Sequence, residues 1–129
     1  MNPSFQRVIL VEYHAHSAEA LRRFLSYTGA TVYVAPDVAS ARALAEAIKF
    51  DLLVTDIQLP DGTGWELAQK LKSECGVPAI AISGHNTLED VAHSMRAGFV
   101  DHISKPLAPE RLAAAMKKAM EARSASVKT

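Results

Sequence analysis

The stretch from Leu52 to Gly64 decides the interpretation of this chain, and it reads LLVTDIQLPDGTG. Its first residues are apolar and too few for a helix, so they predict a buried strand that ends at Asp56. Pro60 and Gly62 then require a turn. Open α/β sheets carry their chemistry at the C-terminal ends of the strands, and we therefore expect Asp56 to lie at a functional site. A carboxylate that only begins a turn is the simpler alternative, and the rest of the chain argues against it.

The composition is typical of one globular domain. The chain has 129 residues, of which 49% are hydrophobic and 22% charged, and its 14 basic and 14 acidic side chains balance. This balance gives no indication of a nucleic-acid or membrane surface. The single Cys75 excludes an internal disulfide, and no apolar run is long enough for a membrane helix or a signal peptide. We expect a cytoplasmic domain over residues 1–123 with a short polar tail at 124–129.

Five strands alternate with five helices along the chain. This alternation predicts a doubly wound, five-stranded parallel sheet with right-handed crossovers and helices on both faces. The strands are expected at residues 8–11, 31–35, 51–56, 78–82 and 99–103, and a helix follows each of them.

Two of these helices carry specific expectations. Ser17 is the expected N-cap of the first helix, and Thr87 is the expected N-cap of the fourth. The apolar spacing of the fourth helix predicts an inner face formed by Leu88, Val91, Ala92 and Met95.

Four polar side chains follow the strands at the edge where Asp56 is expected. They are Glu12, Asp56, Ser83 and Lys105, so the edge combines two carboxylates, a hydroxyl and an ammonium group. This set suits phosphoryl transfer to a carboxylate, because acids can hold Mg²⁺ and the other two groups can bind phosphoryl oxygens.

The chain resembles the receiver domains of the response-regulator family of two-component signalling over residues 7–122. The matching residues are Glu12, Asp56, Pro60, Gly64, Ser83 and Lys105-Pro106, in this order and each at the expected place. The resemblance implies a flavodoxin-like (βα)5 fold with strand order 2-1-3-4-5. It also implies a cis peptide bond before Pro106.

The resemblance further implies a role for each residue of the site. Asp56 would be the phosphoacceptor and would take a phosphoryl group from a histidine of a kinase or phosphotransfer protein. Glu12, Asp56 and the carbonyl of Gln58 would hold Mg²⁺. Ser83 and Lys105 would bind the phosphoryl group, and Ser83 would shift on activation.

Tyr13 departs from the family pattern. The family usually carries a second acid at this position, which contacts the metal directly. A phenol is a poor Mg²⁺ ligand, so we expect weakened metal binding and slower phosphorylation. The alternative is that water fills the place of the missing carboxylate.

Histidine at position 102 is the second departure, because the family usually has Tyr or Phe there. That ring moves together with the Ser83 position, so His102 would be a switch residue with altered or pH-sensitive behaviour. A simple surface histidine is the alternative. Three further histidines fall on loops at this edge: His14, His16 and His85. Their spacing disfavours a transition-metal site. Trp65 is expected to be partly packed at a helix start.

The leading hypothesis is a non-enzymatic signalling domain. It would act through protein contacts made by residues 88–120, since no DNA-binding domain is expected after residue 123. A pseudo-receiver that binds partners without phosphorylation is the alternative, and Tyr13 is its main support. A dehalogenase-like phosphatase would need an acid where Gln58 stands. A flavin carrier would need a phosphate loop after the first strand, which this chain lacks.

Overall fold

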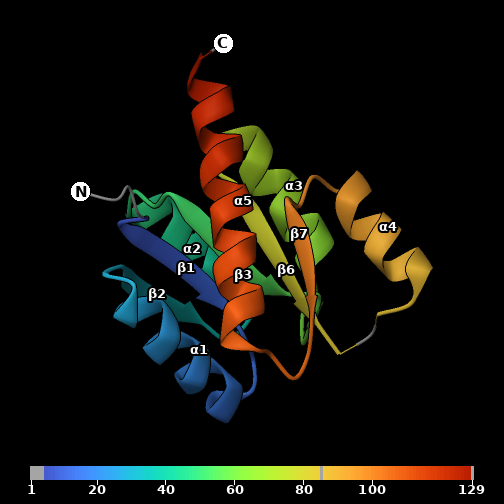
Figure 1. Cartoon of the computed structure of the whole chain (residues 1–129). Coiled ribbons are helices and arrows are strands. Elements are labelled where there is room, and N and C mark those ends of the chain that lie inside the picture. Colours follow the sequence, from blue (N-terminus) through green and yellow to red (C-terminus); the bar gives the residue numbers. More distant parts are fainter. Residues whose placement is uncertain (1–4, 85, 129) are drawn as a thin grey trace.

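The computed structural model describes residues 5–84 and 86–128, with side chains up to residue 123. Its centre is a five-stranded parallel sheet in the order β2-β1-β3-β6-β7 (Figure 1). This order confirms the predicted 2-1-3-4-5 arrangement once the short hairpin β4–β5 is left out of the count. The strands of the main sheet are β1 (Arg7–Val11), β2 (Thr31–Ala35), β3 (Leu52–Asp56), β6 (Ala79–Ser83) and β7 (Asp101–Ser104).

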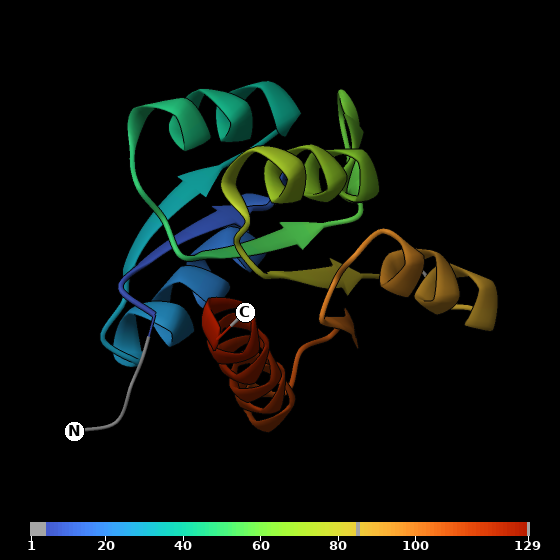
Figure 2. The same cartoon turned by 90° about the horizontal axis from the view of Figure 1, so that it is seen from above.

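Helices cover both faces of the sheet. Seen from above, α2 and α3 lie on one face, α1 and α5 lie on the other, and α4 stands beside the β7 edge (Figure 2). Within the described part of the chain, no helix is both long and apolar enough to span a membrane. The helices are α1 (Ala15–Tyr27), α2 (Val38–Ala47), α3 (Gly64–Cys75), α4 (Leu88–Arg96) and α5 (Pro109–Lys128).

The sheet separates two hydrophobic cores. Leu10 and Val54 belong to the core under α1 and α5, whereas Ile9 and Leu53 belong to the core under α2 and α3. Every residue of β3 is buried, as expected for a central strand of a parallel sheet with both faces covered. Asp56 is therefore carried by a strand that is enclosed along its whole length.

Several boundaries differ from the sequence prediction. The helix α1 begins at Ala15, and His14 occupies the N-cap position without a side-chain hydrogen bond, so the prediction of Ser17 as N-cap is wrong. The strand β7 begins at Asp101 rather than at residue 99. The helix α5 runs to Lys128 and so includes residues expected to form a polar tail.

The inner face predicted for α4 is wrong at Leu88 and Met95, whereas Val91 and Ala92 are half-buried. Leu88 is 91% exposed and Met95 is 50% exposed, whereas Ser94 is fully buried. The predicted cap of this helix is confirmed, because Thr87 and Asp90 form a reciprocal capping box. The helix is thus turned so that Ser94 is its most deeply buried side chain, and the two ends of the apolar stripe lie at the surface.

Gly64 brings the start of α3 against the end of β3. A Cβ atom at this position would collide with the backbone carbonyl of Asp56, and the Gly64 N–H donates to the Ile57 carbonyl at 2.8 Å. Glycine is the residue that permits so close an approach of two backbone segments. A short hairpin formed by β4 (Gln58–Leu59) and β5 (Gly62–Thr63) lies between the end of β3 and the start of α3.

Candidate functional site

Three ionisable side chains meet at the C-terminal edge of the sheet, and we call them the charged cluster: Glu12, Asp56 and Lys105. The Lys105 Nζ donates to Asp56 Oδ2 at 2.7 Å and to both Glu12 carboxylate oxygens at 3.0 and 3.1 Å. The two carboxylates are almost enclosed, with side-chain exposures of 1% for Glu12 and 8% for Asp56. The structure therefore brings into direct contact three of the four polar side chains that the sequence predicted at the C-terminal ends of the strands.

The enclosure of the cluster changes its proton affinities. Burial, as the largest cause, and the nearby Asp56 together raise the pKa of Glu12 to about 7, against the opposing effect of Lys105. Burial alone would lower the pKa of Lys105, but its hydrogen bonds to Asp56 and Glu12 hold that pKa above its usual value. Around neutral pH the cluster therefore holds a charged ammonium group beside a Glu12 carboxyl that is close to its titration point.

The donors of the cluster are compatible with Mg²⁺, which prefers carboxylate and carbonyl oxygen. Only Glu12 and Asp56 supply carboxylates there, and no group of three or more His, Cys, Asp or Glu side chains arranged for a metal is found among the described residues. The side chain of Gln58 is exposed, so its backbone carbonyl is the relevant oxygen.

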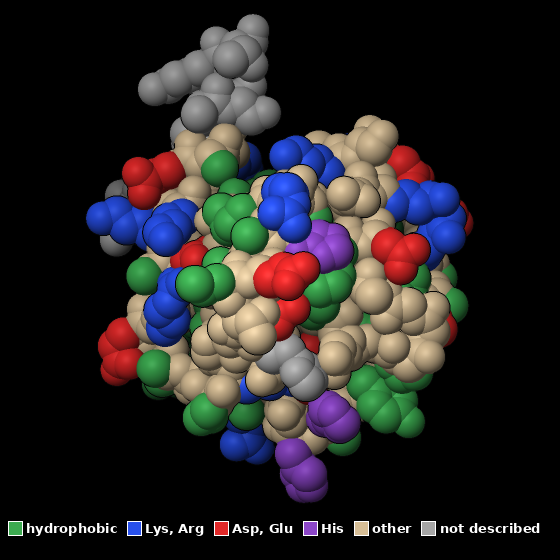
Figure 3. Space-filling model, turned by 90° about the vertical axis from the view of Figure 1, so that its right-hand side faces the viewer, with side chains coloured by type: hydrophobic (Ala, Val, Ile, Leu, Met, Phe, Trp, Pro, Cys, Tyr) green, Lys and Arg blue, Asp and Glu red, His purple; other side chains and the backbone are tan. Residues whose placement is uncertain are grey.

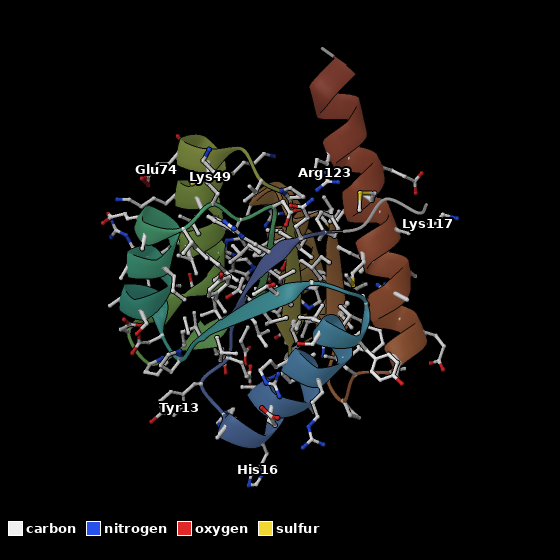
Figure 4. All side chains as sticks on the ribbon, turned by 90° about the vertical axis from the view of Figure 1, so that its left-hand side faces the viewer. Tyr13, His16, Lys49, Glu74, Lys117 and Arg123 are labelled. Carbon is white, nitrogen blue, oxygen red and sulfur yellow. The ribbon has the colours of Figure 1, made fainter. Side chains whose placement is uncertain are left out.

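Tyr13 lies outside the charged cluster. Its side chain is 57% exposed, its ring packs edge-on against His14, and Figure 4 shows it pointing away from the body of the protein. His16 also points outward in this view. His85 lies outside the described residues. The metal site that the sequence disfavoured for these loop histidines is thus not supported by the described ones.

His102 is buried, with only 6% of its surface exposed, so the surface-histidine alternative is wrong. Both ring nitrogens are hydrogen bonded: Nδ1 lies 2.7 Å from Ser94 Oγ, and Nε2 lies 2.8 Å from Asn86 Oδ1. The Trp65 indole N–H donates to the same Ser94 oxygen at 2.9 Å. Asn86 donates from Nδ2 to the Ser83 carbonyl at 3.0 Å. We call Trp65, Ser94, His102, Asn86 and the Ser83 carbonyl the His102 network.

Ser83 connects the two groups of residues. It is 2% exposed, and its carbonyl also accepts a hydrogen bond from the Lys105 backbone N–H at 2.9 Å. Together with Gln58, Trp65 and Asp90, Ser83 lines a small cavity of about 140 Å³ beside the end of β3. The His102 network therefore ends on an atom that also fixes the backbone of Lys105.

Asn86 and Ser94 were not anticipated from the sequence. Neither residue type is specific to such a site, and the apolar stripe of α4 pointed to a different inner face. Trp65 is half-buried at the start of α3, as predicted, and it stacks on His93 with 3.7 Å between ring centroids.

Similarity to known proteins agrees with this geometry. Residues 8–117 match the family model described as the response regulator receiver domain. An uncharacterized 14.6 kDa protein of Leptolyngbya boryana is 33% identical over 108 residues, which is 81% of this chain and 82% of that protein. The chain belongs to the response regulator receiver domain family.

Longer regulators and solved structures are similar as well. The probable transcriptional regulatory protein TcrX of Mycobacterium tuberculosis is 32% identical over 106 residues, covering 81% of this chain and 45% of that protein. The chain thus spans about half the length of such mycobacterial relatives. A receiver domain protein of Methanospirillum hungatei, described as CheY-like, superposes with a TM-score of 0.85 at 27% identity, covering 95% of this chain and 99% of that one.

Proposed function

We propose that this domain takes a phosphoryl group from a phosphohistidine of a partner protein onto Asp56 and signals through protein contacts. The observation that carries the proposal is the bridging position of Lys105, which binds Asp56 at 2.7 Å and Glu12 at 3.0 Å. A fixed ammonium group beside a nucleophilic carboxylate supports phosphoryl transfer, because it offsets the charge on the phosphoryl oxygens.

The proposed transfer forms one bond and breaks one. A carboxylate oxygen of Asp56 attacks phosphorus, the P–N bond of the phosphohistidine breaks, and its electron pair returns to the imidazole ring. The Lys105 ammonium group would then bind the phosphoryl oxygens instead of the Asp56 carboxylate alone. The Ser83 side chain, at the end of the adjacent strand β6, would donate a hydrogen bond to the same oxygens. The product is an acyl phosphate on Asp56.

Receiver domains generally use Mg²⁺ at their acidic site, and Glu12, Asp56 and the Gln58 carbonyl are the groups that would hold it here. The ion supplies neutralisation of phosphoryl charge when it is bound. Its binding favours the ionised form of Glu12, whose pKa is raised to about 7 in the metal-free cluster. With Tyr13 directed to solvent, this site offers one carboxylate fewer than the family pattern.

An apolar groove of about 530 Å³ supports a protein as the phosphodonor. It lies beside Lys105, and α1 lines one side while the start of α5 lines the other; its lining includes Leu21, Phe24, Leu107 and Leu112. A helix that carries the phosphohistidine could cover this groove and place the histidine near Asp56.

The output surface is proposed at residues 88–120. Leu88 and Met95 of α4 are exposed apolar side chains on this side, and Figure 3 shows its hydrophobic groups scattered among acidic and basic ones. His102 is enclosed and would act on this surface from beneath. A partner that maps instead to residues 38–48 would contradict this assignment.

The test is phosphorylation of the purified chain by a small phosphodonor with Mg²⁺, followed by intact mass. We expect one added phosphoryl group that hydroxylamine removes, as it removes an acyl phosphate, and no mass gain for Asp56→Asn. Label uptake by Asp56→Asn would contradict the assignment of the acceptor. A folded wild-type chain that gains no mass would favour the pseudo-receiver alternative, for which the position of Tyr13 is the supporting observation.

A further inference from the structure

Asp61 lies at the turn of the hairpin β4–β5, and its side chain binds a helix outside that hairpin. Its two carboxylate oxygens accept hydrogen bonds from the backbone N–H groups of Val38 at 2.8 Å and of Ala39 at 3.0 Å. These are the first two residues of α2, and they lie 23 and 22 positions earlier in the chain. The carboxylate thus joins the tip of the hairpin to the start of α2.

The helix α2 does not need Asp61 in order to begin. Asp37, which directly precedes the helix, accepts from the Ser40 N–H at 2.8 Å through its side chain and from the Ala41 N–H at 3.1 Å through its carbonyl. Asp61 binds the two remaining N–H groups of the first turn, and Ala39 is exposed, so water can reach this end of the helix. What the Asp61 carboxylate adds is a tie between the hairpin and the helix.

Charge strengthens this tie. A carboxylate that accepts from two N–H groups at a helix N-terminus forms charge-assisted hydrogen bonds and lies at the positive end of the helix dipole. The hydrogen bonds from Val38 and Ala39 accordingly hold the pKa of Asp61 below its usual value. Asp61 is therefore ionised at neutral pH, in the form that accepts both bonds.

The hairpin also packs on the helix. A Cβ atom at position 62 would lie 3.3 Å from Cγ2 of Val38, so the backbone of Gly62 already approaches that side chain closely. The tip of the hairpin therefore meets the first turn of α2 through van der Waals contact as well as through hydrogen bonds.

The hairpin carries the Gln58 carbonyl, one of the oxygens proposed to hold Mg²⁺. Its strands β4 and β5 have only two residues each, which is too few to hold a hairpin in place by pairing alone. At its base, the Gly64 N–H donates to the Ile57 carbonyl at 2.8 Å. The hairpin is thus fixed at its base by this bond and at its tip by Asp61, and the Gln58 carbonyl lies between the two.

We propose that Asp61 is a positioning residue for the metal, which ties the hairpin to α2 and so holds the Gln58 carbonyl in place beside Asp56. It acts through the backbone of the hairpin. Mg²⁺ demands nearly ideal octahedral geometry, so a fixed carbonyl binds it better than a mobile one. The role toward the metal rests on the proposed function, whereas the tie between hairpin and helix does not.

The tie is tested in the metal-free protein by hydrogen exchange followed by NMR. We expect the amides of residues 58–64 to exchange about tenfold faster in Asp61→Ala, because a hairpin released at its tip opens more often. Asp37→Ala is the matched control, since it removes one carboxylate and one cap from the same helix end but leaves the hairpin bonded. Unchanged hairpin exchange in Asp61→Ala, or equal acceleration in both variants, would overturn the proposal.

The consequence for the metal is tested by calorimetric titration with Mg²⁺. We expect Asp61→Ala to raise the dissociation constant about tenfold, the loss typical when a group that orients a metal ligand is removed. Asp37→Ala should bind like the wild type. Asp61→Asn keeps one acceptor oxygen and should give an intermediate value, and it replaces Asp61→Ala if that variant does not fold.

The two measurements together separate the explanations. Equal Mg²⁺ affinity for wild type and Asp61→Ala would overturn the positioning role. A weaker affinity with unchanged hairpin exchange would be an effect of charge alone and would overturn it as well. A folded wild-type protein that binds no Mg²⁺ would count against the proposed function, and the exchange rates would then decide on the tie by themselves.

Discussion

The charged cluster and the His102 network lie on either side of Ser83 and hold their side chains by different physics. The cluster places two nearly enclosed carboxylates on one ammonium group, so its energy depends on protonation and on added cations. The network joins its side chains through directional hydrogen bonds, so its energy depends on geometry and on each partner being present. The first arrangement suits a site that receives a charged group, and the second fixes the relative positions of side chains from α3, α4 and β7.

The largest expected effect concerns the pH dependence of the cluster. The folded-state pKa of Glu12 is raised from 4.5 to about 7, so between these values the unfolded chain has lost a proton that the folded chain keeps. The stability contribution of Glu12 is thus complete below about pH 4.5 and is lost as the pH rises through about 7, by up to about 3 kcal/mol. Urea unfolding of wild type and Glu12→Gln at pH 5 and pH 8 measures this difference.

Two features keep that experiment interpretable. Burial alone would raise the pKa of Asp101, but hydrogen bonds from Arg111 and the His102 N–H lower it to about 2, outside the pH window. Glu19→Gln serves as the control, because hydrogen bonds from Arg22 lower the pKa of Glu19 to about 2. Parallel pH profiles for wild type and Glu12→Gln would contradict the raised pKa.

The second effect concerns the ammonium group that the cluster shares. Lys105→Met should slow phosphorylation by a small phosphodonor about a hundredfold, or about 2.7 kcal/mol, since a fixed cation beside the transferred group is removed. Lys118→Met is the matched control, because Lys118 pairs with Asp101 at 3.3 Å instead. The rates are measured by intact mass over time. Equal rates for wild type and Lys105→Met would contradict a role of the charged cluster in phosphorylation.

The third effect concerns the network. Ser94→Ala leaves the Trp65 indole N–H and His102 Nδ1 without their shared partner in a buried place, so it should lower the unfolding free energy by about 2 kcal/mol. Ser104→Ala, an exposed serine at the end of β7, should change it by less than about 0.5 kcal/mol. Denaturant unfolding followed by circular dichroism compares the two variants. Equal decreases in their unfolding free energies would contradict a stabilising role of the network.

The smallest effect concerns Tyr13, whose exposed ring leaves the cluster with two carboxylates. Tyr13→Asp should tighten Mg²⁺ binding about tenfold, which is about 1.4 kcal/mol, and should speed phosphorylation. Calorimetric titration measures the affinity, and Tyr13→Asn, which offers an oxygen without the charge, is the control. Equal affinity for wild type and Tyr13→Asp would mean that another oxygen already completes the coordination.

The sequence predicted the cluster far better than the network. Apolar runs that end in Glu12, Asp56 and Lys105 placed these groups at one sheet edge, because parallel strands share their C-terminal side. The network had no such local pattern. Ser94 is buried because its partners His102 and Trp65 come from other elements, and those long-range contacts outweighed the apolar stripe at Leu88 and Met95.

The same distinction explains the errors at element boundaries. His14 begins α1 without a capping side chain, so the preference of Ser17 for that position was misleading. Thr87, by contrast, was predictable because its capping box with Asp90 is a purely local interaction.

The most direct test of the central claim identifies the phosphorylated residue chemically. The chain is treated with a small phosphodonor and Mg²⁺, reduced with borohydride, which converts an aspartyl phosphate to homoserine, and mapped by peptide mass spectrometry. The account predicts homoserine at position 56 and at no other aspartate. Homoserine at Asp51 or Asp61 instead, or a phosphorylated chain with Asp56 unchanged, would contradict it.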